Sequence, residues 1–152
     1  MASDRAWSRL STGLGDRGLR AVGKLNVPLY RLTNGRVGGH VGRAPVLLLT
    51  TTGRKSGELR TAPVAYLADG DRYVVIGSNA GNPRPPAWAL NLKANPEAEV
   101  QVRRVKLPVR ARVAEGEERA ELWRRMNEQF PGFDDYEQRT DRDIAVFVLE
   151  PQ

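Results

Sequence analysis

The sequence has no cysteine among its 152 residues and only one histidine, His40. Without thiols the chain forms no disulfide and has no thiolate nucleophile, and a single imidazole excludes a histidine-rich metal site. No apolar run approaches the roughly 18 residues of a membrane-spanning helix, and no hydrophobic signal core follows the N-terminus. These absences favour one cytoplasmic domain, because a chain of this length buries a core without covalent staples.

The formal net charge of +6 is concentrated at the start of the chain. Residues 1–43 carry eight Lys or Arg and two Asp, whereas the other 109 residues carry sixteen charges of each sign. The balanced second part, with no aromatics among its cations, argues against nucleic-acid binding. The basic segment 1–43 is either a flexible, solvated leader or an arm for an anionic surface, such as the inner face of the plasma membrane. Composition leaves both open, and residues 44–152 are expected to form the folded domain.

From residue 44 onward the patterning is that of strands. Runs expected as strands cover residues 45–52, 59–67, 73–76, 100–102, 105–113 and 144–149. Asp69-Gly70 is a hairpin signal, and Pro63 indicates a sheet edge or a bulge. Helices are expected over about 86–94 and 115–130. Six strands with two or three helices predict a mainly β (α+β) fold, a small closed or half-closed barrel with helices outside it.

The stretch LLLTTTGRKSGELR, residues 47–60, ends an apolar strand in a cationic turn. The turn and the residue that follows it supply two glycines, three cations and a hydroxyl: Gly53, Arg54, Lys55, Ser56, Gly57 and Arg60. Glycines let backbone amides approach a ligand closely, and the cations suit a phosphate or a carboxylate. The spacing is not that of a Walker loop. On composition alone, a soluble hairpin tip with Glu58 as a partner is the commoner explanation.

Extended to LLLTTTGRKSGELRTAPV, this stretch resembles the signature of the deazaflavin-dependent nitroreductase family, actinobacterial oxidoreductases that use coenzyme F420. The likeness covers about residues 43–151 and continues in order through DG at 69–70, YVVIGSNAG at 73–81, PAWALNLKANP at 86–96, ERAELW at 118–123 and IAVFVLEP at 144–151. The resemblance implies a six-stranded split β-barrel with flanking helices, as in FMN-binding pyridoxamine-phosphate oxidases. It implies coenzyme F420, an 8-hydroxy-5-deazaflavin, as the cofactor. No metal is expected, because His40 and the acidic residues do not have the spacing of a known ligand set.

The resemblance also implies which residues form the site. Those expected to bind the cofactor, from its phosphate and acidic tail to its ring, are Arg54, Lys55, Ser56, Arg60, Pro63, Ile76, Gly77, Ser78, Asn79, Trp88 and Asn91. Asn79 replaces a Lys of some members, which weakens one tail contact. The expected substrate-binding residues are Phe130, Phe133 and Tyr136, and the hydroxyls of Ser78 and Tyr136 are the catalytic candidates. Phe133 lacks the hydroxyl that relatives have there, so a nitroimidazole substrate is not implied.

The implied activity is hydride transfer from reduced deazaflavin to an electron-poor small molecule, either a quinone, a nitroaromatic or an activated enone. Two alternatives remain open from the residues alone. One is an FMN- or haem-binding split-barrel protein, and the other is a carrier that binds a deazaflavin or a fatty acid without turnover. The chain is expected to be a monomer or a homodimer, because split barrels often pair through a sheet face.

Overall fold

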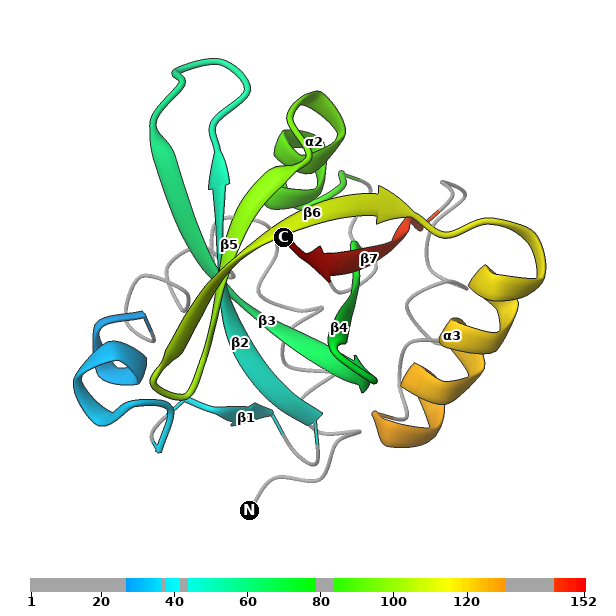
Figure 1. Ribbon diagram of the computed structural model, residues 1–152, viewed down its shortest axis with the longest axis horizontal. Helices are drawn as coiled ribbons and strands as arrows, with labels where there is room; N and C mark the ends of the chain where they lie inside the picture. Colours follow the sequence, from blue (N-terminus) through cyan, green and yellow to red (C-terminus); the bar gives the residue numbers. More distant parts are fainter. Residues whose placement is uncertain (1–26, 37, 42–43, 79–83, 131–143) are drawn as a thin grey trace.

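A computed structural model of the chain describes residues 27–36, 38–41, 44–78, 84–130 and 144–152 (Figure 1). Seven strands and three helices lie within these residues. In chain order they are a helix over residues 27–33, β1 (His40–Val41), β2 (Ala44–Thr52), β3 (Leu59–Asp69), β4 (Arg72–Ile76), α2 (Ala87–Ala94), β5 (Glu97–Val102), β6 (Val105–Val113), α3 (Gly116–Gln129) and β7 (Val146–Pro151).

Six of the strands close into an antiparallel barrel. The sheet order is β1-β2-β3-β4-β7-β6-β5, and β2 also pairs with β5, where Leu49 lies opposite Val100. This second pairing joins the two ends of the sheet, so the barrel strands are hydrogen-bonded all the way round. The predicted six-stranded split β-barrel is confirmed.

Strand β3 changes partner along its length. Its first part pairs with β2 and its last part, from Tyr66, pairs with β4. Pro63 lies opposite Leu48 in the first part, where β4 is not alongside. Proline has no N–H to donate to a second neighbour, so it is tolerated at such an edge, as the sequence predicts.

The apolar strands β4 and β7 lack alternating polar residues because both of their faces are buried. Val75 and Phe147 point into the barrel, whereas Val74 and Val148 pack beneath α3. The α3 residues that cover this outer face are Leu122, Trp123 and Met126. An amphipathic helix thus covers one side of the barrel and excludes water from it. Because both faces of β4 and β7 are buried, their sequences are apolar throughout.

The helix over residues 27–33 covers the barrel in the same way at another place. Tyr30 is 1% exposed and packs with Val46 and Leu48, the outward residues of β2. Its hydroxyl donates to the carbonyl of Gln101 (3.2 Å) and accepts from the amide N–H of Arg103 (2.9 Å). Burial raises the pKa of Tyr30, which keeps this donor protonated. The structure therefore differs from the sequence-based division at residue 43, because part of the basic segment is docked on the barrel.

The two ends of the barrel carry different features. The turn between β2 and β3 projects at one end, close to α2 (Figure 1). The helix over residues 27–33 and the turn between β5 and β6 lie at the other end (Figure 1). Since a strand rises about 3.3 Å per residue, the six steps from Val46 to Thr52 separate the two ends by roughly 20 Å.

Candidate functional site

The cationic turn between β2 and β3 is closed by its own backbone. The N–H of Gly53 donates to the carbonyl of Glu58, and the N–H of Gly57 donates to the carbonyl of Gly53, both at 2.8 Å. Gly57 has a φ of +73°, which glycine adopts without strain. A Cβ on Gly53 would lie 2.7 Å from the Ser56 hydroxyl and 3.1 Å from the Glu58 carbonyl oxygen, so a side chain there would force the turn to shift. Both glycines identified in the sequence therefore suit the shape of the turn.

The cations of the turn differ in their partners. Arg60 forms an ion pair with Glu58 at 3.1 Å, with both side chains largely exposed. Arg54 and Lys55 are exposed, and neither forms an ion pair with any residue in the part of the chain that the structure describes. Ser56 accepts a hydrogen bond from the N–H of Glu58 (3.1 Å), and its hydroxyl hydrogen is still available to donate. The turn thus presents two unpaired positive charges side by side in the sequence.

Asn91 of α2 holds this turn to the barrel. Its side chain is 3% exposed, its Oδ1 accepts from the backbone N–H of Arg54 (3.1 Å), and its Nδ2 donates to the hydroxyl of Thr51 (3.1 Å). Thr51 is fully buried. Both ends of the amide are thus bonded to protein, so Asn91 positions the cationic turn, whatever contact it also makes with a ligand.

The end of β4 lies against α2. The N–H of Gly77 donates to the carbonyl of Ala145 (2.9 Å), and a Cβ on Gly77 would lie 3.2 Å from the Cβ of Ala89. Glycine at this position therefore allows the close approach of the helix without a shift of Ala89. Ile76 points into the core beneath α3, and Ser78 is 6% exposed. The backbone of this strand end is the part that could meet a ligand.

Trp88 lies in the first turn of α2 and is half-buried. Its ring meets that of Phe147 edge to face, with centroids 5.8 Å apart, and it packs against the barrel core. The rest of the indole stays accessible on the helix that also carries Asn91. Trp88 therefore combines a packing role with an open aromatic surface near the cationic turn.

Several predicted residues are not in this arrangement. Asn79, Phe133 and Tyr136 lie outside the described residues, so their predicted roles stay predictions. Phe130 is 3% exposed and packs in the core with α3, and its backbone N–H donates to the carbonyl of Met126 (2.8 Å). This burial favours a core role for Phe130 over contact with substrate.

Sequence reasoning missed Thr51, whose hydroxyl links β2 to Asn91. The signal available was a polar side chain in the TTT run that follows three leucines. A buried hydroxyl needs a hydrogen-bond partner, so a buried Thr51 implies a polar neighbour. The sequence of β2 does not show that this neighbour is Asn91.

Two hollows lie away from the turn. One of 290 Å³ is lined by Leu92, Lys93, Pro96, Ala111, Arg112, Val113 and Phe147. One of 660 Å³ lies at the opposite end of the barrel. The candidate site is recognised by its charge and its hydrogen bonding.

The described residues suit a ligand with an anionic tail and a flat ring. Unpaired cations on a fixed turn match the tail, since charge-assisted hydrogen bonds to carboxylates and phosphates are the strong ones. The partly buried indole of Trp88 lies on α2, which contacts β2, and Gly77 at the end of β4 lies against Ala89 of the same helix. A ring could stack there. The donor set thus fits coenzyme F420.

Comparison with known proteins agrees with this fit. A family model described as F420H(2)-dependent quinone reductase matches residues 22–151. The F420H(2)-dependent quinone reductase Rv1261c of Mycobacterium tuberculosis is 41% identical over 130 residues, which cover 83% of this chain and 87% of that protein.

Solved structures give the same result. An F420-H2-dependent reductase named FDR-A is 41% identical with a TM-score of 0.65, covering 73% of this chain and 98% of that one. A second neighbour, described as a domain-swapped dimer, is 39% identical with a TM-score of 0.67, covering 81% and 93%. The haem storage protein HutZ of Vibrio cholerae, 18% identical with a TM-score of 0.57 over 83% and 89%, shares the fold alone. The chain belongs to the F420H(2)-dependent quinone reductase family, and it is a coenzyme F420-dependent oxidoreductase.

Proposed function

We propose that the cationic turn binds the anionic tail of the cofactor and that the end of β4, together with α2, receives its ring. The observation that carries this proposal is the pair Arg54 and Lys55, unpaired with any described residue, on a turn that Asn91 fixes in place. Both cations are exposed, so pairing them with carboxylates or phosphate requires little desolvation. We expect the attraction to weaken as salt rises.

Binding of the cofactor ring is proposed to depend on the close packing of α2 against the end of β4. Gly77 and Ala89 bring α2 against the end of β4, so the indole of Trp88 and the backbone of residues 76–78 belong to one wall. A reduced 5-deazaflavin supplies a hydride when bound, and the protein contributes position and electrostatics. The role of this wall is to orient the ring and to keep water from one of its faces.

Proton supply completes the reduction of a quinone oxygen. Ser78 lies at the end of β4 with its hydroxyl mostly buried, and it is the candidate donor among the described residues. Tyr136 is the second candidate that the resemblance implies. A hydroxyl within hydrogen-bond reach stabilises the charge that develops on the acceptor oxygen and passes it a proton from water.

Among acceptors, we propose quinones as the preferred class over nitroaromatics and enones. The test is oxidation of F420H2, followed by the loss of its absorbance, with a panel of one soluble quinone, one nitroimidazole and one cyclic enone. We expect kcat/KM to be highest for the quinone by roughly ten-fold or more, a difference of about 1.4 kcal/mol. Equal or faster turnover of the nitroimidazole would contradict the proposed preference.

We also propose that the basic N-terminal segment associates with an anionic membrane surface. No helix in the described ranges is long and apolar enough to cross a membrane. The helix over residues 27–33 exposes Leu29 and Leu32, the latter 82% exposed, next to basic residues. Exposed apolar side chains beside cations are typical of a surface that lies at a lipid interface.

Deletion of residues 1–26 tests the membrane proposal and retains Tyr30. We expect binding to vesicles containing phosphatidylglycerol to fall roughly ten-fold or more, because each basic residue contributes about 1 kcal/mol near such a surface. Cofactor affinity should stay within about two-fold. Deletion of residues 1–40, as a comparison, should lower the melting temperature, since burial of a side chain such as that of Tyr30 is worth about 1.5–3 kcal/mol. Unchanged vesicle binding after the shorter deletion would contradict the proposal.

A further inference from the structure

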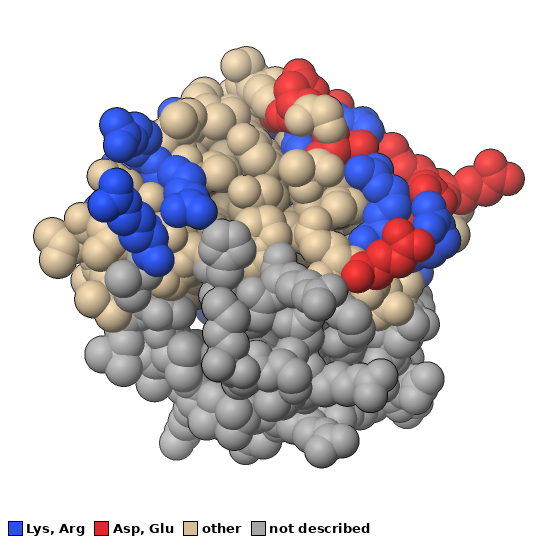
Figure 2. Space-filling view, turned by 90° about the horizontal axis from the view of Figure 1, so that it is seen from below, with Lys and Arg blue, Asp and Glu red and all other residues tan. Residues whose placement is uncertain are grey.

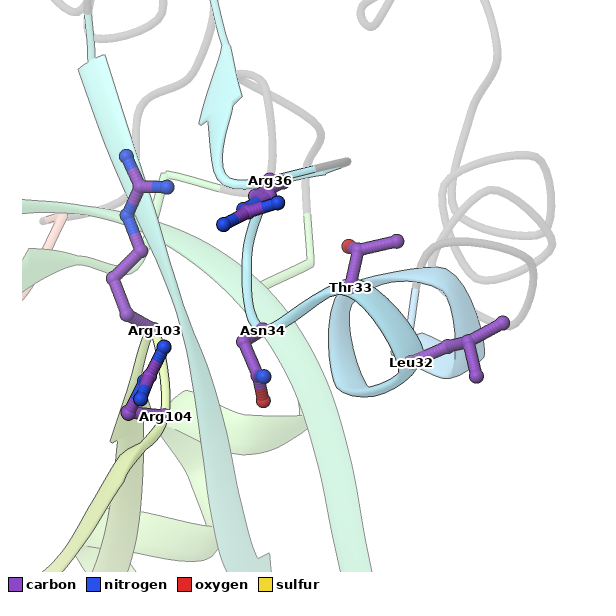
Figure 3. Close-up of a pocket in the computed structure, with 6 residues that line it drawn as sticks. All are labelled: Leu32, Thr33, Asn34, Arg36, Arg103 and Arg104. Carbon is purple, nitrogen blue, oxygen red and sulfur yellow. The ribbon is translucent and has the colours of Figure 1, made fainter.

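The larger hollow lies at the end of the barrel opposite the cationic turn. Its volume is 660 Å³, and its lining residues are Leu32, Thr33, Asn34, Arg36, Arg103 and Arg104. Figure 3 shows the side chains of Arg36 and Arg103 on one side of this hollow and those of Asn34 and Arg104 on the other, while Leu32 points away. Two distant parts of the chain thus place three arginines around one hollow, with Arg36 and Arg103 on the side opposite Arg104.

These three arginines differ from most others on the barrel in having no carboxylate partner. Within the described ranges, Arg36, Arg103 and Arg104 form no ion pair. The arginines that do form ion pairs are Arg60, Arg72, Arg110, Arg112, Arg124 and Arg125. Figure 2 shows blue side chains gathered without red neighbours at one side of the molecule, whereas the two colours are mixed at the other side. Arg103 Nη1 donates only a long hydrogen bond to the carbonyl of Gly35 (3.5 Å), and no carboxylate among the described residues offsets the positive charge around the hollow.

The turn between β5 and β6 is held rigidly at this place. The amide N–H of Arg103 donates to the Tyr30 hydroxyl (2.9 Å), and its carbonyl accepts from the side chain of Gln101 (2.9 Å). The aliphatic stem of Arg103 packs over Gly35, where a Cβ would lie 3.1 Å from it. The buried Tyr30 thus fixes the Arg103 backbone, and Gly35 makes room for its side chain.

Arg103 also has a φ of +58°, in the left-handed region that favours glycine or asparagine. At a two-residue hairpin turn, a glycine or an asparagine would adopt this conformation at lower cost. The chain instead has two arginines at the turn. A side chain that occupies a strained backbone position next to two like charges indicates a use for that side chain.

We propose that this hollow binds a phosphate group, as a second anion site independent of the cofactor site. Guanidinium groups form a planar fork that matches phosphate oxygens, and three of them around one hollow neutralise a monoester or a diester. The amide of Asn34 adds a neutral donor from the opposite wall. The bearer of the phosphate is either a soluble metabolite or a lipid headgroup, since both present the same oxyanion.

The test compares the full chain with the double variant Arg103→Gly/Arg104→Ala. Glycine keeps the positive φ of residue 103, so the barrel is expected to fold with an unchanged or higher melting temperature. A neighbouring single-charge control is Lys106→Ala, which removes an exposed cation of β6 that does not line the hollow. The probes are inorganic phosphate and glycerol 3-phosphate, titrated by phosphorus NMR, and vesicles of phosphatidylglycerol in phosphatidylcholine.

We expect the affinity of the wild-type chain for at least one probe to fall roughly ten-fold or more in the double variant, because two of the three guanidinium groups are lost, and to stay within about two-fold in the control. Binding of the soluble phosphates alone would identify a metabolite site, and binding of the vesicles alone would identify a headgroup site. The proposal would be overturned if the wild type bound none of the probes below about 10 mM, or if the double variant bound them like the wild type. Affinity for F420 reports separately on the cofactor site.

Discussion

Replacing both Arg54 and Lys55 by alanine is expected to weaken F420 binding roughly 100-fold while the melting temperature of the cofactor-free protein changes by no more than about 1 °C. Two exposed cations that have no ion-pair partner among the described residues contribute little to folding. Each charge-assisted hydrogen bond to the tail contributes about 1.5 kcal/mol or more to binding. The measurement is the dissociation constant by fluorescence titration, beside thermal denaturation without cofactor.

Arg103→Gly/Arg104→Ala is the matched control for this variant, because it removes the same net charge from the other end of the barrel. Its affinity for F420 should stay within about two-fold of the wild type, since roughly 20 Å exceeds two Debye lengths at physiological salt. Equal losses in both double variants would mean that the net charge of the chain, and not the cationic turn, attracts the cofactor.

Asn91→Ala is expected to have the second large effect, on stability and on cofactor affinity together. The substitution leaves the buried Thr51 hydroxyl without its hydrogen-bond partner and frees the Arg54 amide. A buried polar group left unpaired costs about 1–3 kcal/mol, which lowers the melting temperature by roughly 3–10 °C in a chain of this size. Affinity for F420 should fall roughly ten-fold or more because the cationic turn is no longer held to the barrel.

The double variant Asn91→Ala/Thr51→Val separates the two effects. Valine replaces the orphaned hydroxyl with a methyl group of similar shape, so part of the lost stability should return. Cofactor affinity should stay low, because nothing restores the bond to Arg54. Recovery of both quantities together would contradict a positioning role for Asn91, and wild-type affinity in Asn91→Ala would contradict it outright.

The strands of the barrel could be predicted from sequence because their buried positions are occupied by apolar residues. The run Val74 to Ile76 is apolar at every position, and α3 covers the outward face that would otherwise carry polar residues. Gly53 and Gly57 likewise reveal the turn, since glycine suits the tight closure at residue 53 and the positive φ at residue 57. These features can be predicted because they depend on residues that are close together in the sequence.

The helix over residues 27–33 was not predicted, because it is short and only one of its faces meets the barrel. Val27 and Tyr30 make that contact, too few residues for a helical period to stand out. Pro28 near its start and Asn34-Gly35 after its end were the available signals. The basic composition of residues 1–43 outweighs these signals, so the sequence predicts one basic segment over this range and no helix.

The link between Asn91 and the cationic turn could not be predicted from sequence either. The partners Thr51 and Arg54 lie 40 and 37 residues away along the chain, and only the packing of α2 against β2 brings them within hydrogen-bond reach. The resemblance placed Asn91 at the cofactor, and the structure adds a connection to the protein itself. Contacts between distant elements form only when the barrel closes, and no short stretch of sequence predicts which residues then meet.

The most direct test of the cofactor site compares binding of F420 with binding of the tail-less 8-hydroxy-5-deazaflavin. If the cationic turn holds the tail and α2 with β4 holds the ring, Arg54→Ala/Lys55→Ala weakens F420 binding roughly 100-fold and changes the affinity for the tail-less compound by less than about two-fold. An equal loss for both compounds, or no loss for either, would contradict the assignment of the tail to this turn.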